Sequence, residues 1–320
     1  IAEFDENDYI LKHSYAAGVA ILDYYTATAT NETAQKLCSA IMPAIMLQRM
    51  LSKAKEILDN RIKVDHYSIE NGLVAHVTSM AVIDYIESIL GDISTGYSIN
   101  YGVLPAVAFG APQKRMRFVL IGVKKSICDD VKLPIGTFTE SNYRTVKDAI
   151  MDLEEIETVT EVSDGDRGVQ LPDAPKDISE LGKQLRNSKI LFNHVSTATT
   201  SDALERFMVI KQGDNFHSLP AELKTTYSDT ERTQNTIYLR LKYDEPSGTV
   251  VNVRKSTWIH PVKHRALSIR EAARLQTFPD SFVFCGTKDS QYQQVGNAVP
   301  PMLAKAIAEH LCRYLDSGRK

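Results

Sequence analysis

Cysteine, positive net charge and long apolar runs are all scarce in this chain of 320 residues. Its cysteines lie far apart and form no Cys-x-x-Cys pair, which favours a reduced, cytoplasmic protein over a disulfide framework: they are Cys38, Cys128, Cys285 and Cys312. His260 and His264 have no thiolate or carboxylate placed to complete a metal site, so we expect no metal. No apolar run approaches the roughly 18 residues that span a bilayer, and no secretory segment is found, so we expect no membrane association.

The formal net charge of −3 is not typical of a protein that binds nucleic acid without specificity. It does not exclude an enzyme that acts on a duplex, because phosphate contacts need a local basic cleft and not a basic protein. With 43% hydrophobic residues, the chain can bury one large core or two modest ones. Composition alone therefore predicts a soluble α/β protein and no particular function.

The stretch from His260 to Pro301 carries the strongest local signals. Ser268 and Glu271 are spaced as a capping box, which predicts that a helix begins there, and Pro279 prevents it from going much further. Gln294–Pro301 then predicts a small-molecule loop between a strand and a helix. Its glycine lets the backbone approach a ligand closely, and the following asparagine offers both a donor and an acceptor. An ordinary tight turn explains these residues equally well by themselves.

The first ninety residues contain a second candidate site. Gly18–Asp23 indicates a short buried strand that ends in a ribose-binding carboxylate, although a turn or helix start is equally consistent. Apolar residues recur at helical spacing in residues 44–60 and 82–90, so we expect two amphipathic helices. Between them residues 64–69 predict a strand. Glu70-Asn71 follows at its carboxyl end, where open α/β sheets bind ligands.

A pair of arginines lies between two further predicted strands, residues 97–104 and 118–123. The second of these is a continuous apolar run, which is typical of a central strand. Arg115 and Arg117 are two residues apart in an extended segment, so both guanidinium groups can face one anionic or carbonyl-rich ligand. The alternative is two arginines on a solvated strand edge.

From about residue 124 to residue 258 the alternation of helix and strand weakens. We expect helices at residues 145–153 and 201–211, and strands at residues 236–241 and 246–251. Asn193 and His194 are best explained as residues that stabilise a loop. Several late basic residues suit the wall of a DNA cleft, although a solvated surface explains each singly: Arg232, Arg240, Lys242, Arg254, Lys255, Lys263, His264 and Arg265.

Four of these segments together resemble one protein family. The run R-E-A-A-R-L-Q-T-F-P-D, followed by Q-V-G-N-A-V-P-P, resembles the last two motifs of the DNA (cytosine-5) methyltransferases. Glu70-Asn71 resembles the family's Glu-Asn-Val motif with Gly72 in place of valine, and G-x-P-Q-x-R-x-R resembles another. The resemblance implies an α/β fold, with a Rossmann-like S-adenosylmethionine-dependent methyltransferase sheet and a smaller, irregular target-recognition domain.

The resemblance also implies an activity and roles for single residues. The family transfers methyl from S-adenosyl-L-methionine to carbon 5 of a flipped cytosine in double-stranded DNA, here in the manner of a sequence-specific restriction–modification enzyme. We expect a monomer, nucleoid-associated if bacterial. The roles are catalysis for Glu70, Arg115 and Arg117, substrate binding for Asn71 and Gln113, and cofactor binding for Asn297, Ala298, Val299 and Asp23.

Two family features are not found in this sequence. The reaction needs a thiolate that attacks carbon 6 of cytosine, yet no Pro-Cys occurs, and the glycine-rich cofactor loop is also absent. We therefore expect an incomplete catalytic domain in residues 1–124 and 263–320, with a recognition domain in residues 125–262. The chain then lacks the front of a normal enzyme, which we favour, or it is a non-catalytic DNA-binding relative or subunit. An adenosylmethionine enzyme with a non-DNA substrate is a third reading.

Overall fold

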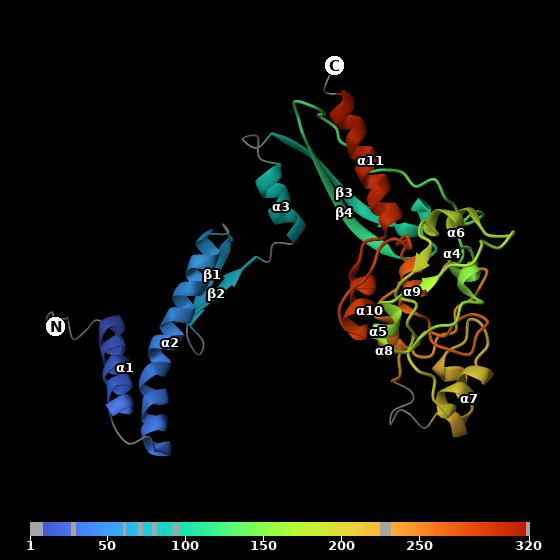
Figure 1. Cartoon of the computed structure of the whole chain (residues 1–320). Helices are drawn as coiled ribbons and strands as arrows, with labels where there is room; N and C mark the ends of the chain where they lie inside the picture. Colours follow the sequence, from blue (N-terminus) through green and yellow to red (C-terminus); the bar gives the residue numbers. More distant parts are fainter. Residues whose placement is uncertain are drawn as a thin grey trace. The chain divides into compact units, whose positions relative to one another are not determined.

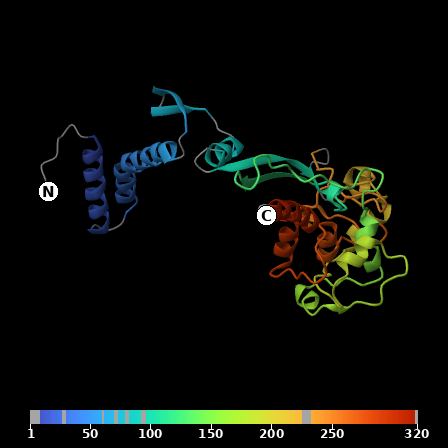
Figure 2. The same cartoon turned by 90° about the horizontal axis from the view of Figure 1, so that it is seen from above.

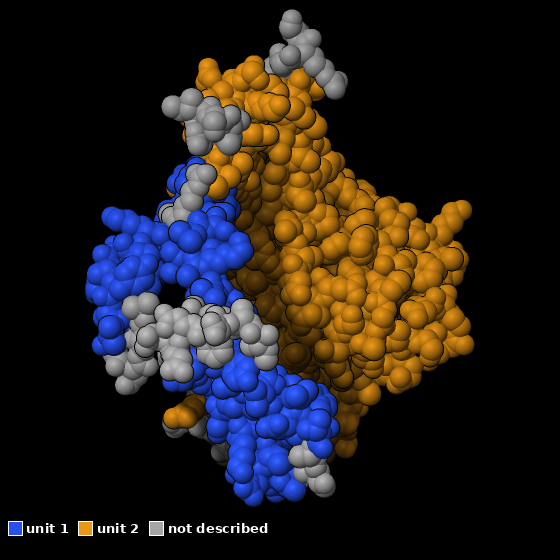
Figure 3. Space-filling model, turned by 90° about the vertical axis from the view of Figure 1, so that its left-hand side faces the viewer, with its two compact units in different colours: residues 1–88 blue, residues 89–320 orange. Residues whose placement is uncertain are grey.

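The computed structural model describes residues 9–26, 30–59, 62–69, 73–78, 82–91, 96–224 and 232–317. The chain divides into two compact units, residues 1–88 (unit 1) and residues 89–320 (unit 2), which are coloured separately in Figure 3. Helix α3 (Val82–Leu90) spans the boundary. The domain limits at residues 124 and 262 stay a prediction. No helix in the described part of the chain is long and apolar enough to cross a membrane.

Unit 1 contains a pair of packed helices and a β-hairpin. Helices α1 (Tyr9–Thr26) and α2 (Asn31–Asp59) contact each other, and β1 (Val64–Ile69) pairs antiparallel with β2 (Leu73–Val77). The strand predicted at Gly18–Asp23 is wrong, because these residues lie inside α1. A six-residue apolar run cannot be told from a helix segment by its periodicity, and the alanines around it favour the helix.

A long antiparallel ribbon forms one side of unit 2. It consists of β3 (Tyr97–Pro105) and β4 (Met116–Lys124), paired along all nine residues. Helix α11 (Pro301–Ser317) runs beside the ribbon in Figures 1 and 2 and packs Ile307, Leu311 and Tyr314 near Ile121. Both predicted strands are thus present. The central position expected for residues 118–123 is wrong, because β4 pairs with β3 alone among the described strands.

The main core of unit 2 surrounds Trp258 and is built from short helices. These elements are α4 (Val146–Ile150), α6 (Glu180–Leu185), α8 (Val253–Ser256), α9 (Ile269–Leu275) and α10 (Lys288–Asn297). Around them lie the short helices α5 (Val162–Gly165) and α7 (Ser201–Val209), the strands β5 (Val169–Gln170) and β6 (Ile190–Leu191), and the 3-10 turns η1 (Ala106–Phe109), η2 (Met151–Leu153), η3 (Phe216–Ser218) and η4 (Ala221–Leu223). The helices predicted at residues 145–153 and 201–211 are confirmed.

The strands predicted at residues 236–241 and 246–251 are wrong. That region makes only isolated bridges, such as Arg240 with Ile259. Arg240 is 3% exposed and donates to the carbonyl oxygens of Ile210 at 2.7 Å and His260 at 2.7 Å. Its guanidinium group thus satisfies backbone oxygens that a sheet partner would otherwise satisfy, and it is not available to a DNA cleft.

Candidate functional site

The capping box predicted from the sequence starts α9. The Oγ of Ser268 accepts the Glu271 N–H at 3.1 Å, and Glu271 Oε2 accepts the Ser268 N–H at 2.8 Å. His194 fixes the same serine, because its Nε2 faces the Ile156 carbonyl at 3.0 Å and must donate there, so its Nδ1 accepts from Ser268 Oγ at 3.0 Å. His194 and Asn193 are buried, which confirms their structural interpretation.

Glu271 is the centre of a buried charge cluster. Burial alone would raise the pKa of Glu271, but Arg265, at 2.6 and 2.8 Å, outweighs burial, so the pKa lies well below its ordinary value. His260 Nε2 lies 3.7 Å from Glu271 Oε1. Because His260 Nδ1 accepts the N–H groups of Val262 and Lys263, the ring proton sits on Nε2. Burial lowers the pKa of His260 to about 4, so the ring is neutral at pH 7.

Two further arginines of α9 fasten this helix to its neighbours. Arg274 binds Asp280 through two contacts of 2.9 and 2.5 Å, and Asp152 at 2.5 Å. Arg270 donates to backbone carbonyls and to Asn193. All of these side chains are buried, and α9 contacts α4 and α10, so the R-E-A-A-R run forms a frame between these two helices.

The Q-x-R-x-R segment is joined to this frame by hydrogen bonds. Gln113 is fully buried, with its Nε2 donating to the Leu275 carbonyl at 2.9 Å and to Gln276 Oε1 at 2.8 Å. Arg115, also buried, donates to the Val250 carbonyl at 2.5 Å and to the Gly296 carbonyl at 2.8 Å. The sequence motifs are therefore brought together through buried main-chain oxygens.

The two arginines do not face one ligand, which corrects the geometry expected from the sequence. Both terminal nitrogens of Arg115 are bound to carbonyls, whereas Arg117 is only partly buried and donates to the Met116 carbonyl at 3.1 Å. The reason is that β4 begins at Met116, so Arg115 precedes the regular strand and points into the core. Arg117 is the arginine that stays accessible.

The Q-V-G-N-A-V-P-P segment also differs from its predicted form. Residues Gln294–Asn297 end α10 instead of forming a loop after a strand, and Pro301 starts α11. A Cβ on Gly296 would lie 2.7 Å from the carbonyl carbon of Val251 and 2.9 Å from the Asn252 nitrogen. The glycine therefore permits close approach of the chain's own backbone, where the sequence suggested a ligand.

The end of α10 nevertheless presents the expected cofactor residues. Asn297 and Val299 are exposed, with Val299 at 47%, and Ala298 is half-buried. Asn297 Oδ1 accepts from Gln293 Nε2 at 2.8 Å, and Gln293 Oε1 accepts from Asn252 Nδ2 at 3.2 Å. Sequence reasoning missed Gln293 and Asn252. The i to i+4 spacing of Gln293 and Asn297 was the only signal available.

The remaining predicted site residues lie in or beside unit 1. Asp23 is an exposed residue of α1. Glu70, predicted to be catalytic, and Asn71, predicted to bind substrate, lie outside the described residues. Cys38, the one cysteine on the expected side of the motif order, is an exposed residue of α2. No group of three or more His, Cys, Asp or Glu residues suited to a metal is found within the described ranges.

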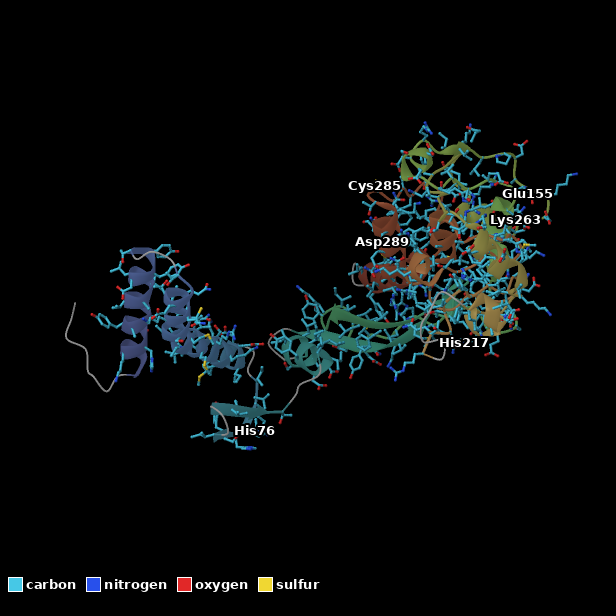
Figure 4. The ribbon with its side chains drawn as sticks, turned by 90° about the horizontal axis from the view of Figure 1, so that it is seen from below. His76, Glu155, His217, Lys263, Cys285 and Asp289 are labelled. Carbon is cyan, nitrogen blue, oxygen red and sulfur yellow. The ribbon has the colours of Figure 1, made fainter. Side chains whose placement is uncertain are left out.

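Several of the late basic residues form surface ion pairs. Lys263 and Glu155, both labelled in Figure 4, are 3.0 Å apart, and Arg254 lies 3.1 Å from Asp289. Arg265 is instead committed to Glu271. The set therefore contains surface residues, such as Lys263 and Arg254, and structural residues, Arg240 and Arg265, whose guanidinium groups are bound inside the protein.

Comparison with known proteins decides the family. Residues 71–313 match the family model of the C-5 cytosine-specific DNA methylases. The chain belongs to this family. The match spans most of the chain and contains the Q-x-R-x-R segment, the α9 frame and the end of α10. The methyltransferase fold and the family membership expected from the sequence are thereby confirmed.

Curated relatives are type II methyltransferases of bacteria. M.DdeI of Desulfomicrobium norvegicum is 30% identical over 250 residues, which cover 73% of this chain and 59% of M.DdeI. M1.HphI of Haemophilus parahaemolyticus is 34% identical over 214 residues, 67% of this chain and 48% of the relative. M.AquIB of Picosynechococcus is 37% identical over 134 residues, 38% of this chain and 88% of that relative. The chain thus spans about half the length of the first two relatives.

A solved structure agrees with these relatives. The crystal structure of a prophage protein of E. coli, described as a DNA modification methyltransferase, superposes with a TM-score of 0.56 at 26% identity. The superposition covers 72% of this chain and 65% of that one. The α/β fold class is confirmed, with three two-stranded antiparallel sheets among the described residues.

Proposed function

We propose that this chain supplies the base-binding, target-recognition and part of the cofactor-binding residues of a sequence-specific DNA (cytosine-5) methyltransferase. The enzyme transfers methyl from S-adenosyl-L-methionine to carbon 5 of a cytosine that is flipped out of the DNA duplex. The observation that carries the proposal is the junction at Arg115. This residue links the Q-x-R-x-R segment to Val250 and to Gly296, beside the expected cofactor residues.

The exposed end of α10 fits one side of the cofactor. Asn297 presents an amide and Val299 an aliphatic side chain, a combination that suits a nucleoside, whose base has apolar faces and polar edges. When bound, the cofactor supplies an electrophilic methyl group. Gln293 and Asn252 orient the Asn297 amide, because their hydrogen bonds fix its Oδ1 and leave its Nδ2 to donate.

We assign the base contacts to Glu70 and Arg117. Glu70 holds and protonates the ring-nitrogen edge of the flipped cytosine, as the resemblance implies. Arg117, which stays accessible, holds the target nucleotide. Arg115 positions the Q-x-R-x-R segment through its hydrogen bonds to the Val250 and Gly296 carbonyls. Duplex DNA is the substrate and is read by the irregular part of unit 2, and the protein works in the cytoplasm.

A chimera tests this proposal. Residues 62–313 replace the matched segment of M1.HphI, and purified chimera is incubated with S-adenosyl-L-methionine and duplex DNA. We expect 5-methylcytosine in the nucleoside digest by mass spectrometry. Glu70→Gln should lower the rate roughly 10²- to 10⁴-fold, the usual contribution of a general acid. Arg265→Lys, which alters the partly buried ion-pair partner of Glu271, is the control for an effect on stability alone. Methyl groups on adenine, RNA or protein, or an unchanged rate for Glu70→Gln, would contradict the assignment.

A further inference from the structure

Three polar residues form a stripe along α10. Asp289, Gln293 and Asn297 follow one another at intervals of four residues, so their side chains lie about one turn apart on the same face of the helix. Asp289 belongs to the first turn and is labelled in Figure 4, and Asn297 is the last residue of the helix. The Q-V-G-N-A-V-P-P segment includes Asn297 but neither of the other two residues. The stripe thus leads from a carboxylate to an expected cofactor residue.

Asn252, which immediately precedes α8, joins two members of this stripe. Its Nδ2 donates to Asp289 Oδ1 at 3.2 Å and to Gln293 Oε1 at 3.2 Å. Gln293 Nε2 donates in turn to Asn297 Oδ1 at 2.8 Å. Gln293 therefore accepts at one end of its amide and donates at the other. We call Asp289, Asn252, Gln293 and Asn297 the relay.

Asp289 is the member that fixes the direction of the relay. An amide can present either its oxygen or its nitrogen, whereas an ionised carboxylate can only accept. Asn252 must therefore turn its nitrogen towards Asp289, and because that nitrogen also lies against Gln293, Gln293 must offer its oxygen there. Gln293 is then left with its nitrogen for Asn297, which accepts with its oxygen. One carboxylate thus sets the orientation of three amides.

The surroundings of Asp289 and Asn252 agree with this role. Hydrogen bonds from Asn252 and from Arg254, whose Nη1 lies 3.1 Å from Asp289 Oδ1, hold the pKa of Asp289 below its ordinary value, so the carboxyl is ionised at neutral pH. Asn252 is 8% exposed, and its Oδ1 is buried without a hydrogen-bond partner among the described residues. A buried acceptor without a partner costs free energy. The contacts of its nitrogen, and not those of its oxygen, therefore determine how this amide is turned.

We propose that Asp289 is a positioning residue for the cofactor, because it makes Asn297 a hydrogen-bond donor towards S-adenosyl-L-methionine. The inference rests on the proposed function, since Asn297 meets the cofactor only in a methyltransferase. With its oxygen held by Gln293, Asn297 has its Nδ2 left to donate. The atom that it selects on the cofactor is an acceptor, such as a carboxylate oxygen, a hydroxyl oxygen or an unprotonated ring nitrogen.

Asp289→Asn removes the constraint on the relay. The new amide can donate as well as accept, so Asn252 can turn its oxygen towards it and towards Gln293. The reversed relay keeps the same number of hydrogen bonds, but Asn297 then donates to Gln293 and turns its oxygen towards the ligand. If both directions are equally populated, half of the molecules can donate to the cofactor, and its apparent affinity falls about twofold.

NMR spectroscopy of the full chain 1–320 tests the direction of the relay without cofactor. Asparagine side chains are labelled with ¹⁵N, and the NH2 signals of Asn297 are identified by their loss in Asn297→Ser. In the wild type both protons should exchange rapidly with water, because Oδ1 and not Nδ2 faces Gln293. In Asp289→Asn the signals should shift and the exchange of one proton should slow about twofold or more, because Gln293 binds that proton in the reversed relay.

Arg254→Gln is the matched control. It removes the same ion pair as Asp289→Asn but leaves the carboxylate, which can still only accept. The Asn297 signals should therefore stay where they are in the wild type. Unchanged Asn297 signals in Asp289→Asn would overturn the inference. Equal changes in both variants would also overturn it, because the lost ion pair would then explain the effect.

A kinetic measurement connects the relay to the cofactor. In the M1.HphI chimera, Asp289→Asn should raise the KM for S-adenosyl-L-methionine about twofold or more and leave kcat nearly unchanged, because the Asn297 contact contributes to binding and not to the chemical step. An unchanged KM beside shifted Asn297 signals would overturn the inference, since the direction of the amide would not matter to the cofactor. A chimera that methylates no cytosine contradicts the proposed function, and the NMR comparison still decides the direction of the relay.

Discussion

Arg115 donates a 2.8 Å hydrogen bond to the carbonyl of Gly296, a residue 181 positions away in the sequence. The same guanidinium group donates to the Val250 carbonyl at 2.5 Å. One buried cation thus joins the start of β4, the segment before α8 and the end of α10. This arrangement explains why an arginine in a motif read as nucleotide-binding is 3% exposed.

Arg115→Lys should destabilise unit 2. A lysine has no planar fork, so at least one of the two buried carbonyls loses its donor. We expect the free energy of unfolding to fall by about 2–3 kcal/mol in urea titrations. Arg117→Lys, two residues along and partly exposed, should change it by less than about 0.5 kcal/mol. An equal fall in the free energy of unfolding for both variants would show that the buried hydrogen bonds of Arg115 do not stabilise unit 2.

Asp280→Asn should be more damaging than the loss of a surface charge. Arg274 would keep its buried charge with only Asp152 to balance it, and breaking a buried pair costs about 3–5 kcal/mol. The exposed pair between Lys242 and Glu245 provides the control, because Glu245→Gln should leave the free energy of unfolding almost unchanged. Chemical denaturation of both variants checks the contrast, and similar values would refute it.

Gly296→Ala should lower stability although alanine favours helices. The added Cβ would lie 2.7 Å from backbone atoms of Val251, which cannot move aside as a flexible side chain can. Overpacking of this kind costs about 1–3 kcal/mol. Gly248→Ala is the control, since its Cβ would meet only Trp258 at 4.0 Å. A more stable Gly296→Ala protein would mean that the backbone contact is not close in solution.

Stability should fall as the pH is lowered from about 6.5 to about 4. Burial lowers the pKa of His260 to about 4, so in this window the unfolded chain binds a proton that the folded chain does not. The stabilisation is therefore complete above pH 6.5 and is lost as the pH falls towards 4, by about 3 kcal/mol. Burial also lowers the pKa of His194, which acts in the same direction.

Urea titrations at several pH values check this dependence. His260→Asn should flatten the change of unfolding free energy between pH 6.5 and pH 4. An identical slope for His260→Asn and wild type would exclude His260 as the source.

This chain alone should not form a covalent adduct with cytosine. None of its cysteines follows a proline, and Cys38, the nearest candidate by motif order, is an exposed residue of α2. Incubation with S-adenosyl-L-methionine and duplex DNA carrying 5-fluorocytosine should give no denaturation-resistant band on a gel. The same assay should give a band with the M1.HphI chimera. A peptide adduct at Cys38 would show that a divergent active-site loop is present.

Local signals in the sequence predicted many elements correctly. Residue spacing over a few neighbouring positions was enough to predict three kinds of element. These are the capping box at Ser268 and Glu271, the helices at residues 44–60 and 82–90, and the strands β3 and β4. Gly18–Asp23 failed because a short apolar run contains no period long enough to separate strand from helix. Glu70 and Asn71 lie outside the described residues and stay predictions.

By itself, the sequence determined the family, the order of its motifs and the chemistry that each motif can supply, since these depend on residue types and short spacings. Only the tertiary structure decided which of those side chains face solvent. Gln113 and Arg115 look like ligand-binding residues in the sequence, yet their partners are carbonyls 135 to 181 positions away.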